Sequence, residues 1–291
     1  MTTSLELTSY WLLGRSGLRV SPLALGTMTF GADWGWGADE ADARRIFDAF
    51  VDRGGNFIDT ANAYTNGSSE RLVGKFAEGR RDRLVISTKY TMGMSDTPAW
   101  QISRMQAIAD RRGWSPFIAL QSEYSLVERT AERDLIPMAE EMGLGVIPWS
   151  PLANGVLSGK YSRADLAAGD LTLLQGSRKD VAIGNGSLSE RSLDIADVVK
   201  AVAAETGNSP AQIALAWTLL NSGVAATLVG ARTPKQLNDN LGALEVSFDD
   251  EQRARLEKVS AITLGFPHEL LRMPTIVRSI GGGTVLPART W

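Results

Sequence analysis

Three side chains suited to acid–base chemistry follow two short apolar segments of the sequence. Asp59 and Tyr64 come after residues 55–58, and Lys89 ends the segment 84–89. In parallel α/β proteins the C-terminal ends of strands are where active sites are built, so we expect these residues to meet there. A lysine ammonium favours phenolate and lowers the pKa of a nearby tyrosine, while an aspartate holds the lysine in place. The spacing therefore predicts a proton donor, Tyr64, supported by Lys89 and Asp59.

Apolar runs and helical periods that alternate along the chain predict βα repeats. We expect strands near residues 20–26, 56–60, 84–89, 117–121, 144–149 and 226–230. We expect helices near residues 39–53, 69–79, 98–112, 130–142, 192–206, 209–222 and 234–245. Residues 10–13 and 18–20, joined by a glycine-containing turn, are typical of a β-hairpin. The pattern is that of a parallel sheet with its helices outside.

These segments resemble the aldo-keto reductases over nearly the whole chain. The likeness rests on residues 55–64 and 84–90, on Leu-Gly-Thr-Met-Thr-Phe-Gly at 25–31, on residues 149–161, and on residues 230–241. It implies one TIM-type (β/α)8 barrel domain over residues 1–291. It also implies an NADP-dependent enzyme that transfers a hydride from NADPH to an aldehyde or ketone, with Tyr64 as the proton donor.

The resemblance further implies a binding site for NADP(H). Ser95, Asp96 and Gln121 would hold the nicotinamide carboxamide, although Asp96 stands where the family usually has Asn. Trp149 would contact the nicotinamide face. The remaining implied contacts along the cofactor are Gly26, Thr27, Met28, Asp59, Ser150, Pro151, Leu152, Lys160, Arg232, Gln236, Asp239 and Asn240. The long segment 162–190 would fold over the pyrophosphate, as long loops in compact domains are often functional.

The spacing of the last four of these residues favours NADP over NAD. Arg232, Gln236, Asp239 and Asn240 lie three or four positions apart at the start of a predicted helix, so they reach one ligand from neighbouring turns. A guanidinium binds phosphate through a bidentate fork, which suits Arg232 to a 2′-phosphate. The helix N-terminus adds partial positive charge.

One part of the expected barrel is absent from the sequence. Only about six strands are found, and Lys89, at the end of the third family strand, is followed almost directly by Ser95, which resembles the start of the segment after the fifth strand. Residues 90–94 stand where two βα units, roughly 60 residues, are expected. Either the sheet closes with six strands, or a neighbouring chain completes it, or a segment is missing from the sequence between Met94 and Ser95.

The same gap removes the catalytic histidine of the family, which comes after the fourth strand. The sole histidine, His268, lies near the C-terminus and is more typical of a structural residue. A second function is therefore considered: a catalytically impaired NADP-binding regulatory protein of the same fold. Turnover of a carbonyl substrate separates the two hypotheses.

Composition excludes several other classes. The net charge is −3, no basic stripe stands out, and no apolar run reaches membrane-spanning length, so we expect neither nucleic-acid nor membrane partners. The absence of cysteine and the single histidine argue against a metal site and for the cytoplasm. No Gly-x-Gly-x-x-Gly follows a strand, which argues against a Rossmann dehydrogenase. We expect a small-molecule carbonyl partner and allow for a homo-oligomer.

Overall fold

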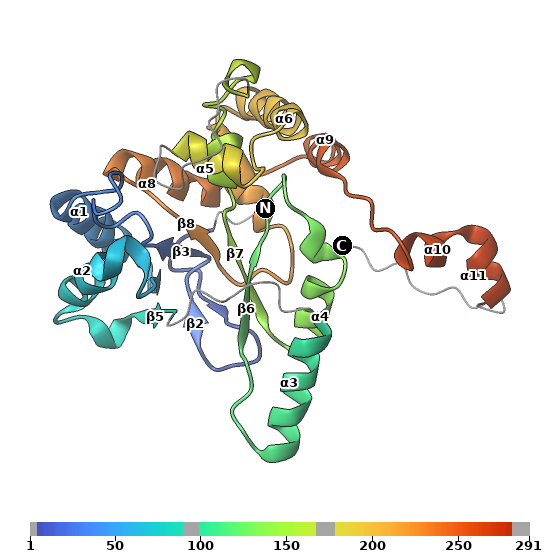
Figure 1. Ribbon diagram of the computed structural model, residues 1–291, viewed down its shortest axis with the longest axis horizontal. Coiled ribbons are helices and arrows are strands. Elements are labelled where there is room, and N and C mark those ends of the chain that lie inside the picture. The colour runs from blue at the N-terminus through green and yellow to red at the C-terminus, as the bar shows by residue number, and fades with distance from the viewer. Residues whose placement is uncertain (1–4, 90–98, 167–177, 281–291) are drawn as a thin grey trace.

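The computed structural model describes residues 5–89, 99–166 and 178–280 of the chain. Its centre is a set of parallel strands (Figure 1). They are β3 (Leu23–Gly26), β4 (Phe57–Asp59), β5 (Val85–Ser87), β6 (Ala119–Glu123), β7 (Gly145–Trp149) and β8 (Thr227–Val229). Four of them pair in the order β5-β4-β3-β8, and β6 pairs with β7. All six coincide with or overlap the strands predicted from the sequence.

Two backbone hydrogen bonds connect the two ladders. Val146 N donates to the Gly223 carbonyl at 2.8 Å, and Ala225 N donates to the Val146 carbonyl at 2.8 Å. β7 therefore lies beside the segment that leads into β8, and the spatial order becomes β5-β4-β3-β8-β7-β6. This order is an arc of a barrel with β5 and β6 at its ends.

The two end strands are less buried than the strands between them. Every residue of β5 and β6 is half-buried, whereas β4 and β8 are fully buried. Within the described residues, no backbone ladder joins β5 to β6. The expectation of about six strands is confirmed, and the arc is open on the side where the sequence lacks two βα units.

Side chains inside the arc form a separate apolar cluster. Ala24, Phe57, Ile147 and Leu228 pack there, with Ala119 at the edge. Because side chains of a strand alternate between its two faces, these residues fix which positions of each strand point inward. Asp59, Gln121 and Trp149 each lie two residues after an inward-pointing residue of the same strand. They therefore also face the interior, at the C-terminal ends of the strands.

A hairpin covers the opposite end of the arc, as predicted. β1 (Trp11–Leu12) and β2 (Arg19–Val20) are antiparallel, and Arg15 N donates to the Gly143 carbonyl, just before β7. Val20, fully buried, joins the interior cluster. This end is thereby filled with side chains, which leaves the C-terminal ends of the strands for ligands.

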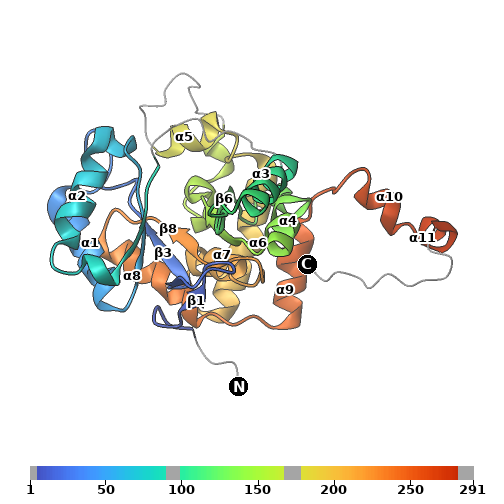
Figure 2. The same ribbon diagram turned by 90° about the horizontal axis from the view of Figure 1, so that it is seen from below.

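The helices surround the sheet, apart from the two C-terminal ones, which project away from it (Figures 1 and 2). They are α1 (Glu40–Asp52), α2 (Ser68–Ala77), α3 (Ala99–Arg112), α4 (Leu135–Met142), α5 (Arg178–Gly184), α6 (Glu190–Thr206), α7 (Pro210–Thr218), α8 (Pro234–Leu241), α9 (Asp250–Ser260), α10 (His268–Arg272) and α11 (Pro274–Ile280). Asp39 caps α1 by accepting from Asp42 N, as its position predicts. The seven predicted helices are present, several of them shorter, while α5, α9, α10 and α11 were not predicted.

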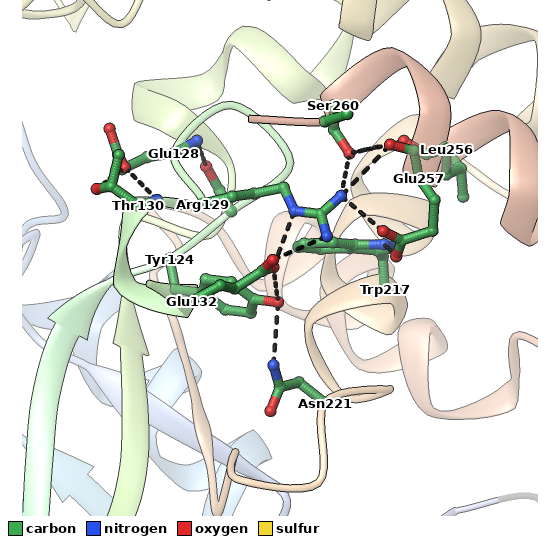
Figure 3. Close-up of polar contacts among 12 residues, drawn as sticks. Tyr124, Glu128, Arg129, Thr130, Glu132, Trp217, Asn221, Leu256, Glu257 and Ser260 are labelled. Carbon is green, nitrogen blue, oxygen red and sulfur yellow. Dashed lines mark hydrogen bonds and ion pairs between the residues drawn. The ribbon is translucent and has the colours of Figure 1, made fainter. Parts of the chain in front are cut away.

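A buried polar network ties α9 to the loop after β6 (Figure 3). Arg129 is 8% exposed and donates to both carboxylate oxygens of Glu132, at 2.8 and 3.0 Å. It also pairs with Glu257 at 2.6 Å and donates to Ser260 Oγ at 2.8 Å. Its guanidinium lies 5.0 Å from the centre of the Trp217 ring. The network holds three chain segments together through one cation.

The C-terminal helices α10 and α11 project away from the barrel (Figures 1 and 2). Phe266, which precedes α10, is 83% exposed. Across the described parts of the chain, every helix is too short or too polar to cross a membrane.

Candidate active site

A cavity of about 660 Å³ lies at the C-terminal ends of the strands. Its walls come from β3, β4, β6, β7 and β8, from the loop after β7, and from α5, α7 and α8. The lining residues include these sequence-predicted ones: Gly26, Met28, Asp59, Tyr64, Lys89, Gln121, Trp149, Ser150, Pro151, Leu152, Lys160, Arg232, Gln236, Asp239 and Asn240. The fold therefore brings residues from distant parts of the sequence to one site.

The predicted acid–base residues meet at one edge of this cavity. The Lys89 ammonium lies 2.7 Å from Asp59 Oδ2 and donates to the Thr60 carbonyl at 3.0 Å. It also lies 5.0 Å from the centre of the Tyr64 ring. Asp59 is 2% exposed, so the ion pair is shielded from water on the carboxylate side. Such a pair orients the ammonium toward the phenol.

The second oxygen of Asp59 is also engaged. Ser87 Oγ donates to Asp59 Oδ1 at 2.7 Å, and Gln121 Nε2 donates to the same oxygen at 3.1 Å. These bonds cross the interior from β5 and β6 to β4. They form a polar layer directly above the apolar cluster and fix the carboxylate in one orientation.

The environment of Tyr64 keeps its phenol protonated. Burial raises the pKa of Tyr64, and the Asp59 charge adds to that rise, while the charge and hydrogen bond of Lys89 lower it. The net direction is upward. Lys89 thus lowers the pKa of Tyr64, as the sequence predicts, but desolvation of the phenolate outweighs the cation.

The turn after Tyr64 is held in an unusual backbone conformation. Thr65 and Asn66 have φ angles of 46° and 53°, in the left-handed region that residues other than glycine seldom occupy. The Thr65 hydroxyl donates to the Phe30 carbonyl at 2.6 Å and accepts from Ser69 N at 3.0 Å. These bonds stabilise the turn and fix the position of Tyr64.

The loop after β7 forms a second unusual turn. Ser150, Ala153 and Asn154 have φ angles of 55°, 46° and 55°. Gly155, at φ 92°, lies against Lys160, and a Cβ there would come within 2.6 Å of Lys160 Nζ. The φ of 92° favours glycine at this position, and the missing side chain leaves space in which the Lys160 ammonium lies.

The far end of the cavity is built on α8. Thr233 caps this helix by accepting from Gln236 N, and Gln236 Oε1 accepts from Arg232 N at 2.8 Å. Asp239 accepts from Ser209 Oγ at 2.9 Å, and Asn240 donates to the Gly230 carbonyl at 3.2 Å. In the described ranges the Arg232 side chain has no carboxylate partner, so its charge is available to an anion.

Some predicted residues are placed differently or lie outside the described chain. Thr27 is fully buried and does not line the cavity; its hydroxyl donates to the Asp59 carbonyl at 3.0 Å. Ser95 and Asp96 lie outside the described residues. Of the segment 162–190, residues 167–177 also lie outside the described chain, and Val181 and Asn185 line the cavity.

Several lining residues were not singled out from the sequence. Asn154 and Ser158 contribute polar groups, and Asn154 Nδ2 donates to Ser187 Oγ at 3.0 Å. The Asn-Gly pair at 154–155 is a turn signal that could have marked this loop. No three His, Asp or Glu side chains in the described part of the chain cluster so as to hold a metal ion.

Comparison with known proteins identifies relatives that are similar to this chain over most of its length. The sequence model of the Aldo/keto reductase family matches residues 22–95 and 91–261. The "Uncharacterized oxidoreductase YrpG" of Bacillus subtilis (strain 168) is 33% identical over 318 residues, covering 83% of this chain and 93% of the relative. "Aryl-alcohol dehydrogenase [NADP(+)]" of Phanerodontia chrysosporium is 27% identical and covers 87% of this chain and 86% of its own. "Norsolorinic acid reductase" of Aspergillus flavus is 27% identical, and the match covers 89% of this chain and 83% of the relative.

The alignments also locate the gap in this chain. The two family matches meet at residues 91–95, where the sequence lacks the expected βα units. Because 83% of 291 residues is about 242, about 76 of the 318 positions aligned with the Bacillus protein have no counterpart here, which is close to two units of about 30 residues. The matches cover both sides of the gap and every strand of the arc. The chain belongs to the aldo/keto reductase family and is an oxidoreductase shortened by an internal segment.

Proposed function

We propose that the protein is an NADP-dependent reductase that converts an aldehyde or ketone to an alcohol, with Tyr64 as the proton donor. Aldo/keto reductases use NAD(P)H, and the relatives named above include an aryl-alcohol dehydrogenase whose name specifies NADP(+). The observation that carries the proposal is the convergence of Tyr64, Lys89 and Asp59 at one edge of a cavity whose other end holds Arg232.

The residues present fit an elongated dinucleotide. The cavity runs from the strand ends to α8, and its loop wall includes Gly155, beside which the Lys160 ammonium lies. Lys160 at the middle and Arg232 at the far end supply positive charge suited to phosphate groups. Trp149, 40% exposed at the end of β7, offers an aromatic face to the cavity. NADPH, when bound, would supply the hydride.

The protein's own groups would then perform the proton transfer. Tyr64 holds its proton at neutral pH because burial raises its pKa, so the phenol can donate to the oxygen of the forming alcohol. Lys89, fixed by Asp59, stabilises the phenolate that remains. Gln121 and Ser87 keep Asp59 in place, so the ion pair needs no rearrangement during the reaction.

Replacement of Tyr64 tests the proposal. Tyr64→Phe keeps the ring and removes the donor, and we expect the rate of NADPH consumption with an aromatic aldehyde to fall by about 10²- to 10⁴-fold. NADPH binding, followed by the cofactor's fluorescence, should be unchanged. Tyr10→Phe is the matched control, because Tyr10 lies at the other end of the barrel and donates to the Gly54 carbonyl. Full activity of Tyr64→Phe would remove Tyr64 from this role.

The missing segment supports a second candidate. The βα units absent between β5 and α3 include the position of the family's catalytic histidine, and His268 on α10 does not line the cavity. A catalytically impaired NADP-binding regulatory protein fits that observation. Such a protein would bind NADPH but reduce no aldehyde, whereas a reductase would bind NADPH and reduce the aldehyde.

A further inference from the structure

Large apolar side chains gather at two places on the surface of the molecule. Of the fourteen that are exposed among the described residues, nine belong either to α3 and the loop after it or to the C-terminal arm, residues 264–280. The first group, called the α3 surface, consists of Trp100, Met105, Trp114, Phe117 and Ile118. The second group, called the arm surface, consists of Phe266, Leu270, Leu271 and Met273. Large exposed apolar patches are typical of interaction sites in soluble proteins.

The α3 surface lies at one open end of the arc. Helix α3 leads into β6, the end strand, and contacts α4 on one side. On the other side of α3, the sequence lacks the two βα units that would supply a neighbouring helix. The inner face of α3 is buried through Ile102 and Ala109, whereas Trp100, which is 61% exposed, has no helix over it in the described part of the chain. The shortening of the chain thus explains why this surface is bare.

Hydrogen bonds hold the loop of the α3 surface in one conformation. The side chain of Gln106 donates to the Phe117 carbonyl at 3.0 Å and accepts from Phe117 N at 2.8 Å. The Arg112 guanidinium lies 4.9 Å from the centre of the Trp114 ring. The backbone at Phe117 is therefore fixed while its ring is 52% exposed. A surface that is already ordered loses little conformational entropy when a partner packs on it.

The C-terminal arm is fixed at its base. Arg133 donates to the Thr263 carbonyl at 2.6 Å, and Arg191 donates to the carbonyls of Ser260 and Ala261 at 3.1 and 3.3 Å. From residue 264 to residue 280, the hydrogen bonds of the arm stay within the arm, and none of its side chains belongs to the three apolar clusters of the described chain. The arm lies clear of the barrel (Figures 1 and 2). Its apolar side chains are therefore available to a second molecule.

The exposed apolar area matches that of an interface between two copies. The nine side chains are on average about half exposed, so at roughly 200 Å² for a large side chain they expose about 900 Å² per chain. If each arm covers the α3 surface of the other copy, the pair buries about 1,800 Å², and specific interfaces bury about 1,200–2,000 Å². Because both surfaces belong to one chain, a two-fold axis covers all of them and closes the assembly at two copies.

We propose that two copies of this chain form a dimer in which the C-terminal arm of each copy packs its apolar side chains on the α3 surface of the other. The exchange covers the face of α3 that the missing βα units leave bare. The dimer does not depend on the proposed enzymatic activity, and no residue of either surface lines the cavity.

The molar mass in solution, measured by light scattering, tests the dimer. The unsubstituted protein should have twice the mass of one chain. Leu271→Glu places a charge in the arm surface and Trp114→Glu places one in the α3 surface, and each should weaken the dimer by about 100-fold or more. Both side chains are exposed in the single chain, so both variants should fold, which circular dichroism checks.

Tyr10→Glu is the matched control for these two variants. Tyr10 is 41% exposed and donates to the Gly54 carbonyl just after α1, on the opposite side of the barrel from α3 and the arm (Figure 1). A charge at this position should leave the dimer intact.

Crosslinking tests which surfaces meet. The sequence has no cysteine, so Leu271→Cys and Phe117→Cys each introduce a single thiol. In a mixture of these two variants, a short bismaleimide should join one copy of each into a covalent dimer, with much less product from either variant alone. A chain that carries both substitutions should likewise be linked to a second chain.

Three results would overturn the inference. If the unsubstituted protein has the mass of one chain, there is no dimer. If the dimer persists in both Leu271→Glu and Trp114→Glu, it is built from other surfaces. If the chain with both cysteine substitutions is linked internally, with no increase in mass, the arm packs on α3 of its own copy.

Discussion

Lys89 Nζ and Asp59 Oδ2 lie 2.7 Å apart; Asp59 ends β4, and Lys89 follows β5, the strand that pairs with β4. The Asp59 side is almost fully buried and the lysine side chain is 23% exposed. The pair connects the polar layer of the interior with Tyr64. Thr60 N donates to the Ser87 carbonyl and Asn62 N donates to the Lys89 carbonyl, so backbone hydrogen bonds beyond the strand ends fix the pair before any ligand binds.

Removal of the Lys89 charge should impair the chemical step. In Lys89→Met the pKa of Tyr64 rises further and the phenolate loses its cation. We expect kcat and kcat/KM to fall together by about 10²-fold or more, because the interaction matters most in the transition state. Lys75→Met is the control, since Lys75 forms an exposed ion pair with Glu40 far from the cavity. A variant with altered KM and normal kcat would contradict this role.

Replacement of Arg232 should change cofactor preference. A guanidinium bound to a 2′-phosphate makes charge-assisted hydrogen bonds, so Arg232→Gln should weaken NADPH binding by about 10- to 100-fold. NADH lacks that phosphate, and its affinity should stay the same. Lys235→Gln removes a positive charge from the exposed side of the same helix and should affect neither cofactor. Titration of cofactor fluorescence measures both constants, and an equal loss for NADPH and NADH would argue against the assignment.

A methyl group at Gly155 should disturb the middle of the cofactor site. The Cβ of Gly155→Ala would collide with Lys160, and alanine is strained at the φ of 92° found there. We expect weaker binding of NADPH and of NADH alike, because the pyrophosphate is common to both. Gly74→Ala in α2 meets nothing within 4 Å and should leave binding unchanged. Unaltered affinities in Gly155→Ala would show that the turn at residue 155 does not shape the cofactor site.

The Arg129 network should be essential for stability. Arg129→Met leaves the buried Glu132 carboxylate without its bidentate partner, and such a loss typically costs about 3–5 kcal/mol. Urea unfolding followed by tryptophan fluorescence measures the change. Arg163→Met is the control: its three carboxylate partners are exposed, and exposed ion pairs contribute little. Equal unfolding midpoints for both variants would show that the buried network is dispensable.

The sheet could be predicted from the sequence because its strands are apolar and bounded by turns, as Phe57 and Ile58 before Asp59 illustrate. Helix α9 could not, because only Leu256 and Ser260 of its residues are buried and it lacks an apolar stripe. Its position depends on Arg129, which lies 131 residues earlier than Ser260 and contacts it only in the folded protein.

The candidate site could likewise be predicted from the sequence only in part. Tyr64, Lys89 and Arg232 could be chosen from local motifs, and the structure brings them to one cavity. The raised pKa of Glu123, which lies outside the cavity lining, could not be predicted, because it arises from burial in the folded chain and from the charge of Glu128. The net pKa of Tyr64 likewise depends on how much water the folded chain excludes.

The pairing of Leu23 with Thr227 has a consequence for how the chain is made. β3, the first strand of the arc, is completed by the last one, so its fully buried residues wait for most of the polypeptide to leave the ribosome. Pairing over such a distance is slow, and apolar strands that wait for partners are prone to aggregate. Between the synthesis of the first and the last strand of the arc, β3 therefore lacks one of its two neighbours in the sheet.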